Sequence, residues 1–276
     1  MLFSRRRAVS AGCAAGLACV VPLARFARAG RETFVERSDL SVVFEDAGVS
    51  GAFVLFDGRR DTFTVVGGER ALQRYVPAST FKITNSLIAL EAGAVADQNE
   101  VIPYGGKTQP FKAWERDMSL LEAVPASNVP VFQEIARRVG LDRYRLWLDK
   151  LDYGNGETGQ VVDRFWLDGP LAISAVEQAV FLDRLARREL PMSRRSQDVV
   201  ASLVRLEERD GRTLHAKTGW LTSVQPNIGW WVGWVERPDG EHRAFALNID
   251  MSALAEAPKR IEIGRAILGR LGILPL

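Results

Sequence analysis

Cysteine and histidine are scarce in this 276-residue chain, which has only two of each. Both cysteines, Cys13 and Cys19, lie in an N-terminal stretch that we expect to be removed. The mature protein would then have no thiol for a disulfide, a cysteine nucleophile or a cysteine-based metal site. His215 and His242 lie far apart and lack the paired spacing of a zinc hydrolase. The sequence therefore argues against thiol and zinc chemistry.

An excess of one charge is also missing, because the formal net charge is only +2 and much of that excess lies near the N-terminus. Nucleic-acid binding usually needs a clustered basic face, so we expect no nucleic-acid partner. The composition, 47% hydrophobic and 25% charged, is that of a globular protein with a real core. No linker-like stretch interrupts residues 30–276, which we expect to form a single domain with two lobes.

The first 29 residues are typical of a cleavable export signal. They combine basic residues at 5–7, an uncharged stretch over 8–24 and the small-x-small tripeptide 27–29. The uncharged stretch is short for a membrane span and contains Pro22. We expect cleavage before Gly30, periplasmic localisation and no stable membrane association afterwards. The arginine pair keeps a twin-arginine export route open.

Apolar periodicity predicts an α/β (α+β) fold. Short apolar or β-branched runs between turn residues predict strands at 40–44, 52–56, 62–66, 213–218, 228–235 and 244–249. The middle of the chain is mainly helical, with helices expected over 131–139 and over 175–185 behind the N-cap candidate Ser174, and a closing helix spans about 259–271. We expect a central antiparallel sheet built from both ends of the chain and flanked by helices, with a mainly helical insertion.

Ser79 and Lys82 form a Ser-x-x-Lys motif at the start of a helix that runs up to Gly93. A spacing of three places both side chains on one helical face, so they can touch. A serine hydroxyl needs a base to become a nucleophile, and an amine is a base only when it is uncharged. Burial lowers a lysine pKa by disfavouring the ammonium form. The motif alone is weak evidence, since the same pair occurs on many exposed helix faces.

Two further elements strengthen the case for an enzyme. Lys217-Thr218-Gly219 follows an apolar strand, and its glycine would let a ligand approach the backbone. Ser127-Asn128-Val129 lies between two helical patterns, where a loop could present a second hydroxyl. The structural alternative for the first element is an edge-strand lysine before a turn, and for the second it is an N-cap serine before Pro130. Their joint occurrence in this order is the arrangement of penicillin-recognising serine enzymes.

With these motifs the chain resembles the class D, oxacillinase-type β-lactamases over essentially the whole predicted mature sequence. The resemblance rests on the strings at 77–82, 127–129, 153–155 (Tyr153-Gly154-Asn155), 165–167, 174–178, 217–219 and 229–236. Class A enzymes carry Ser-Asp-Asn at the second element, whereas Asn128 and Val129 follow the serine here. Ala216 stands before Lys217 where many members have glycine. The resemblance implies the serine β-lactamase and penicillin-binding transpeptidase fold.

The resemblance also implies a mechanism. Ser79 would attack the β-lactam carbonyl to give an acyl-enzyme that water hydrolyses. Lys82 would be carboxylated by carbon dioxide to N6-carboxylysine, the base for both steps, and Trp166 would donate its indole N–H to that carbamate. Ser127 would pass a proton to the β-lactam nitrogen beside the positive charge of Lys217. No metal and no other cofactor is implied.

The remaining roles concern substrate binding. The backbone N–H groups of Ser79 and Trp220 would form the oxyanion hole. Thr218 and Arg260 are candidates for binding the substrate carboxylate. The assignment of Arg260 depends only on the short sequence match at 257–260, and a surface arginine on the last helix is nearly as good an interpretation. The other substrate-binding residues implied are Val129, Leu167 and Gly219.

Three rival interpretations stay open from the sequence. A non-hydrolysing penicillin-binding sensor or peptidoglycan peptidase shares the three elements but keeps its acyl-enzyme for long times. An exported binding protein would carry the motifs by coincidence. A general serine esterase is disfavoured because the Gly-x-Ser-x-Gly elbow is missing. The expected partner is a small β-lactam, and a homodimer is compatible with the sequence.

Overall fold

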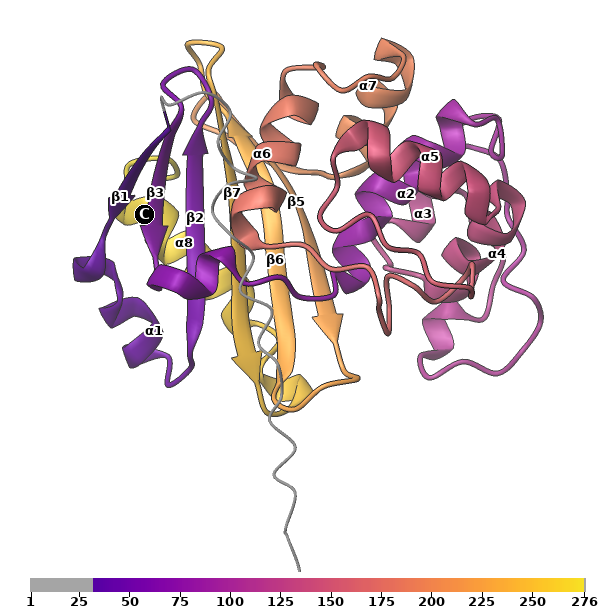
Figure 1. The fold of residues 1–276 in the computed structure, drawn as a ribbon, viewed down its shortest axis with the longest axis horizontal. Coiled ribbons are helices and arrows are strands. Elements are labelled where there is room, and N and C mark those ends of the chain that lie inside the picture. Colours follow the sequence, from indigo (N-terminus) through magenta and orange to yellow (C-terminus); the bar gives the residue numbers. More distant parts are fainter. Residues whose placement is uncertain (1–31, 276) are drawn as a thin grey trace, which may run out of the picture. The chain divides into compact units, whose positions relative to one another are not determined.

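One seven-stranded sheet organises residues 32–275, the part of the chain that the structure, a computed structural model, describes. Its strands are β1 (Thr33–Glu36), β2 (Gly51–Asp57), β3 (Thr62–Val66), β4 (Arg205–Arg209), β5 (Arg212–Leu221), β6 (Asn227–Glu236) and β7 (His242–Met251). They lie in the order β1-β3-β2-β7-β6-β5-β4 (Figure 1). All neighbours pair antiparallel except β1 and β3, which run parallel.

Strands from both ends of the chain meet at the centre of this sheet. β2 from the N-terminal part pairs with β7 from the C-terminal part, with Val54 opposite Ala246. The long strands β5, β6 and β7 continue the sheet on the far side. The predicted antiparallel sheet built from both ends is confirmed, with the parallel β1–β3 pair as an addition.

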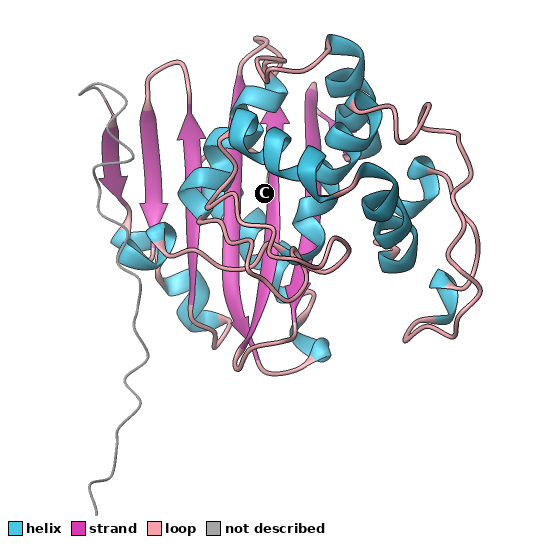
Figure 2. Ribbon diagram, turned by 45° about the vertical axis from the view of Figure 1, so that its right-hand side comes forward, coloured by secondary structure: helices cyan, strands magenta, loops and turns pink. Residues whose placement is uncertain are grey.

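Helices cover both faces of the sheet and form a separate group beside β5. The α-helices are α1 (Val42–Asp46), α2 (Lys82–Glu91), α3 (Leu120–Ala123), α4 (Val129–Val139), α5 (Leu141–Leu151), α6 (Ala175–Ala186), α7 (Arg194–Leu203) and α8 (Lys259–Arg270). Short 3-10 helices are η2 (Ser38–Leu40), η3 (Gly68–Leu72), η4 (Ala78–Phe81), η5 (Lys112–Trp114) and η6 (Leu254–Glu256). Figure 1 shows α6 in front of the sheet and α8 behind it, while α2 to α5 and α7 form the helical insertion beyond β5 (Figure 2).

Side-chain caps explain where two of the predicted helices begin. Ser174 accepts a hydrogen bond from the backbone N–H of Glu177 at 3.2 Å, and the Glu177 carboxylate accepts one from the N–H of Ser174 at 2.8 Å. This reciprocal capping box starts α6 at the expected residue. Helix α4 begins at Val129, two residues before the predicted start, because the Asn128 side chain caps the N–H of Val131.

The predicted strand at 40–44 is wrong, since this segment forms η2 and then α1. Its buried apolar residues are Leu40, Val43 and Phe44, which is the i, i+3, i+4 spacing of one helical face rather than the alternation of a strand. Strands β1 and β4 were not predicted. Their residues are almost all exposed, so neither shows the buried face that marks a strand in a sequence.

A close contact joins α8 to the sheet. A Cβ atom at Gly264 would lie 2.2 Å from a ring carbon of Trp231, so only glycine lets the helix lie this near β6. The buried core at this face takes in Phe53, Phe245 and Ile267. This packing sets the position of α8, whose first turn carries Arg260.

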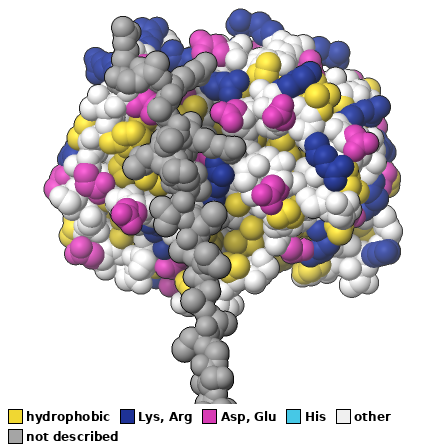
Figure 3. Space-filling view, viewed as in Figure 1, with side chains coloured by type: hydrophobic (Ala, Val, Ile, Leu, Met, Phe, Trp, Pro, Cys, Tyr) yellow, Lys and Arg dark blue, Asp and Glu magenta, His cyan; other side chains and the backbone are white. Residues whose placement is uncertain are grey.

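The predicted signal, residues 1–29, falls outside the described residues. None of the helices within 32–275 is both long and apolar enough to cross a membrane. On the face seen in Figure 3, basic and acidic side chains are interspersed over the described surface.

Candidate active site

Ser79 and Lys82 lie where the η4 turn runs into α2. The Lys82 Nζ atom is 2.8 Å from Ser79 Oγ, within hydrogen-bond distance. Lys82 is fully buried, whereas Ser79 is partly exposed. The structure therefore brings the two residues of the Ser-x-x-Lys motif into contact, with Ser79 partly exposed and the amine enclosed.

The surroundings of Lys82 favour its uncharged form. Burial, and to a lesser degree the charge of Lys217, holds the pKa of the Lys82 amine well below its ordinary value of 10.5. The Phe132 ring lies 5.3 Å from Nζ, and Phe81 stacks on Trp166 with ring centroids 5.6 Å apart. Phe132 was not among the predicted site residues, although it stands one helical turn beyond Val129 on the buried face of α4.

Ser127 presents its hydroxyl from the loop between α3 and α4. Its backbone is left-handed, with φ of 52°. The alternative that this serine caps α4 is wrong, because Asn128 is the N-cap residue and also donates to the backbone carbonyl of Trp114 at 3.1 Å. Asn128 therefore fixes the loop, and the Ser127 hydroxyl is free to lie 3.1 Å from the Nζ atom of Lys217.

Lys217-Thr218-Gly219 lies on β5, at the end that faces the η4 turn. Lys217 is buried, and its Nζ atom also donates to the carbonyl of Thr218 at 3.1 Å. Burial, helped by the charge of Arg260, lowers the pKa of Lys217 to about 7. A Cβ at Gly219 would lie 2.9 Å from the carbonyl oxygen of Pro77. Gly219 was expected to let a ligand approach the backbone; in the structure it allows the strand and the Ser79 turn to approach closely.

Arg260 reaches the same strand from α8. Its Nη1 group donates to the carbonyl of Gly219 at 2.6 Å, and its Nε group donates to the carbonyl of Ala257 at 2.8 Å. Partial burial lowers the pKa of the Arg260 guanidinium from its ordinary value. The alternative of an uninvolved surface arginine is therefore wrong, since the side chain lies against the Lys-Thr-Gly strand. Trp220 follows Gly219 on β5.

Trp166 lies in the loop between α5 and α6, together with the partly exposed Leu167. It is fully buried, and its indole N–H has no hydrogen-bond partner among the described residues. Buried donors are almost always paired, and this N–H is available for an acceptor.

The Tyr153-Gly154-Asn155 motif fixes the loop that carries Trp166. Asn155 accepts a hydrogen bond from the N–H of Ala172 at 3.0 Å and donates to the carbonyl of Pro170 at 2.8 Å, so it ties the start of the loop to its end. Gly154 has φ of 59°, and a Cβ there would lie 2.2 Å from the Ala172 carbonyl. Tyr153 is buried, which raises the pKa of its phenol. The motif therefore acts in this structure as a scaffold for the loop.

Taken together, these residues make two adjoining pairs. Ser79 with Lys82 combines a hydroxyl with an enclosed amine, and Ser127 with Lys217 places a second hydroxyl beside a second amine. Within residues 32–275 no group of three or more His, Cys, Asp or Glu side chains could hold a metal ion. Two serine–lysine pairs between a sheet edge and a helical insertion define the class of penicillin-recognising serine enzymes.

Comparison with known proteins narrows this class. Residues 54–269 match the family model of the penicillin binding protein transpeptidase domain. β-Lactamase OXA-5 of Pseudomonas aeruginosa is 40% identical over 234 residues, which cover 84% of this chain and 87% of that protein. β-Lactamase OXA-48 of Klebsiella pneumoniae is also 40% identical, over 240 residues that cover 87% and 90% of the two chains.

A solved structure supports the same family. The class D β-lactamase YbXI from Nostoc has a TM-score of 0.83 at 38% identity and covers 86% of this chain and 100% of its own. The chain belongs to the class D β-lactamases and is a serine β-lactam hydrolase. The resemblance inferred from the motifs is confirmed.

Proposed function

We propose that this enzyme hydrolyses β-lactam antibiotics through an acyl-enzyme on Ser79, with a carboxylated Lys82 as the base of both steps. The observation that carries the proposal is the environment of the Lys82 amine, which is fully buried, apolar on one side and 2.8 Å from the nucleophile. A carbamate forms only from an uncharged amine, which adds carbon dioxide and releases one proton. Burial supplies the uncharged amine.

The unpaired indole N–H of Trp166 supports the same modification. An anionic carbamate on Lys82 would give this buried donor an acceptor, which would otherwise be missing. The Phe132 ring lies 5.3 Å from the amine, and the amine belongs to a fully buried side chain, which keeps it from water. The carbamate would supply a base for the serine proton in acylation and for the water proton in deacylation.

In acylation, the Ser79 oxygen forms a bond to the β-lactam carbonyl carbon while its proton passes to the base on Lys82. The backbone N–H groups of Ser79 and Trp220 are assigned to the carbonyl oxygen, where preorganised donors stabilise the developing charge. As the ring C–N bond breaks, Ser127 gives its proton to the nitrogen and is reprotonated through the adjacent Lys217, 3.1 Å away.

Substrate binding is assigned to the strand and loops that border these groups. Thr218 and Arg260 would hold the substrate carboxylate, and the closeness of the guanidinium to the Gly219 carbonyl supports this assignment. Val129, Leu167 and Gly219 would form the apolar and backbone walls. We also propose export to the periplasm after removal of residues 1–29.

The test is hydrolysis of a chromogenic β-lactam by enzyme freed of carbon dioxide, with and without added bicarbonate. We expect bicarbonate to restore turnover, and Ser79→Ala to abolish turnover while leaving the melting temperature nearly unchanged. Intact-mass measurement separates the rival sensor: a long-lived adduct without turnover would indicate a non-hydrolysing penicillin-binding protein. Retained hydrolysis by Ser79→Ala would overturn the assignment of the nucleophile.

A further inference from the structure

The turn that carries the nucleophile has a strained backbone. Ala78, immediately before Ser79, is buried and left-handed, with φ of 49°. Residues with a Cβ rarely adopt this conformation, and it persists only where surrounding contacts enforce it. Contacts within and around the turn must therefore hold this conformation in place.

One hydrogen bond spans the strained residue. The Thr80 hydroxyl donates to the carbonyl of Pro77 at 2.8 Å, which closes the turn around Ala78 and Ser79. The indole N–H of Trp230, on β6, donates to the carbonyl of Val76 at 3.1 Å. The turn is thus tied internally at Thr80 and externally to β6.

A second external tie comes from α6. The Gln178 side-chain amide donates to the Thr80 hydroxyl oxygen at 2.9 Å, and Gln178 is only 2% exposed. Since the Pro77 oxygen can only accept, the single hydroxyl hydrogen of Thr80 goes to it. The group of Gln178 that faces the hydroxyl therefore has to be a donor. The amide fixes the direction of the Thr80 hydrogen bond as well as its position.

Helix α6 is itself clamped to the segment that leads into the turn. Glu177, next to Gln178, accepts hydrogen bonds from Nε of Arg74 at 3.0 Å and takes part in the capping box with Ser174. Tyr75 and Ile173 form a β-bridge beside them. Gln178 therefore projects from a rigid support, and a change of its side chain will not be absorbed by movement of the helix.

We propose that Gln178 is a positioning residue for acylation, which holds the Ser79 turn through Thr80. It touches no reacting atom. It acts on the placement of Ser79 Oγ relative to Lys82 and on the direction of the Ser79 backbone N–H. This inference rests on the proposed acylation of Ser79, and it adds a role that the three catalytic motifs do not contain.

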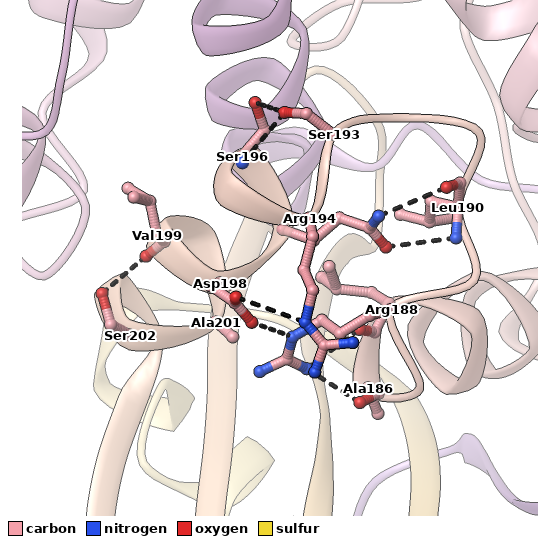
Figure 4. Close-up of polar contacts among 12 residues, drawn as sticks. Ala186, Arg188, Leu190, Ser193, Arg194, Ser196, Asp198, Val199, Ala201 and Ser202 are labelled. Carbon is pink, nitrogen blue, oxygen red and sulfur yellow. Dashed lines mark hydrogen bonds and ion pairs between the residues drawn. The ribbon is translucent and has the colours of Figure 1, made fainter.

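The test uses two variants of nearly equal size. Gln178→Glu replaces the donor by a carboxylate that competes with Pro77 for the Thr80 hydrogen, whereas Gln178→Met removes the donor without introducing an acceptor. The matched control is Gln197→Glu on α7, since Gln197 is also buried, at 1% exposure. Its amide pairs with the backbone N–H and carbonyl of Leu190, in the region drawn in Figure 4.

Acylation is measured by rapid mixing of the full chain with benzylpenicillin in saturating bicarbonate and detection of the covalent adduct by intact mass. Deacylation is followed separately as decay of that adduct. We expect Gln178→Glu to lower the second-order acylation constant about tenfold or more, since small misplacement of a nucleophile is costly. Gln178→Met should lower it less, and Gln197→Glu should stay within about twofold while losing melting temperature.

Thr80→Val provides a second measurement that does not depend on the folding of Gln178→Glu. With the hydroxyl removed, Gln178→Met should cause no further loss of acylation. An equal loss in Gln178→Glu and Gln197→Glu, or full additivity of Thr80→Val and Gln178→Met, would overturn the positioning role. Failure of the parent enzyme to form any adduct would instead overturn the proposed function, so the two failures are distinct.

Discussion

Replacement of Trp166 by phenylalanine tests the carboxylation of Lys82 most directly. Trp166 is fully buried, packs on Phe81 and has an unpaired indole N–H. Phenylalanine keeps an aromatic ring in the stack but removes the donor. We therefore expect an enzyme that folds normally and needs far more carbon dioxide.

The size of the effect follows from the hydrogen bond that is lost. A hydrogen bond to a charged group contributes about 1.5–3 kcal/mol. With about 1.4 kcal/mol for each tenfold change in an equilibrium constant, Trp166→Phe should weaken the affinity of Lys82 for carbon dioxide about 10-fold to 150-fold. The bicarbonate concentration for half-maximal activity should rise by the same factor.

Stability should respond in a different way. Without carbon dioxide, the variant is relieved of an unpaired buried donor, which costs about 1–3 kcal/mol, and loses packing of similar magnitude from the smaller ring. The two contributions offset each other, so the melting temperatures should be close. Bicarbonate should then raise the melting temperature of the parent, because a ligand that binds the folded state stabilises it, and should raise that of the variant much less.

The assay is a bicarbonate titration of initial rates with a chromogenic β-lactam, with parallel melting curves. Trp234→Phe is the matched control, since Trp234 is equally buried and lies on β6 beside His215, away from Lys82. We expect it to lose melting temperature and keep the bicarbonate midpoint of the parent. The same midpoint in Trp166→Phe and in the parent would refute the reasoning.

Three further predictions concern pH and packing. The pKa of Lys217 is lowered to about 7, in part by the charge of Arg260. Because the charge of Lys217 is assigned to acylation, kcat/KM should fall as pH rises through 7. Arg260→Gln removes the neighbouring charge and should move this decline to higher pH in a pH–rate profile. Interaction with His215, whose Nε2 atom lies 3.4 Å from the carboxylate, lowers the pKa of Glu236 from 4.5 to about 2, so the contribution of this carboxylate to stability is complete above about pH 4.5 and is lost as pH falls through 2. Glu236→Gln should therefore lower the urea midpoint at pH 7 and match the parent near pH 2. Gly219→Ala places a Cβ 2.9 Å from a backbone carbonyl and should cost about 1–3 kcal/mol of stability in urea unfolding, together with most of the activity.

Each of these has an outcome that contradicts it. If the decline in kcat/KM stays at the same pH in Arg260→Gln, loss of the Lys217 charge is not its cause. A constant difference in urea midpoint between pH 7 and pH 2 would show that the Glu236 carboxylate does not act through its ionised form. Parent-like stability of Gly219→Ala would mean that the turn and the strand are not held together at this point.

The catalytic motifs and the architecture could be predicted from the sequence because both depend on local order along the chain. Ser79 and Lys82 meet through the spacing of one helical turn, and β6 carries a long apolar run over 228–235. Predictions failed where local patterns were short or exposed. The apolar run at 40–44 fits a helix as well as a strand, and only burial of one face separates the two.

The sequence by itself determined the fold class, the family and the position of the Ser-x-x-Lys motif, since these follow from residue spacing and from motifs in a given order. Tertiary structure alone decided which side chains surround them. Phe132 over Lys82, Arg260 on the Gly219 carbonyl, and Gln178 on Thr80, which is 98 positions away along the chain, are contacts between separate elements. No periodicity encodes such contacts, because they depend on how helices and strands pack against one another, and that packing sets the burial that lowers the pKa of Lys82.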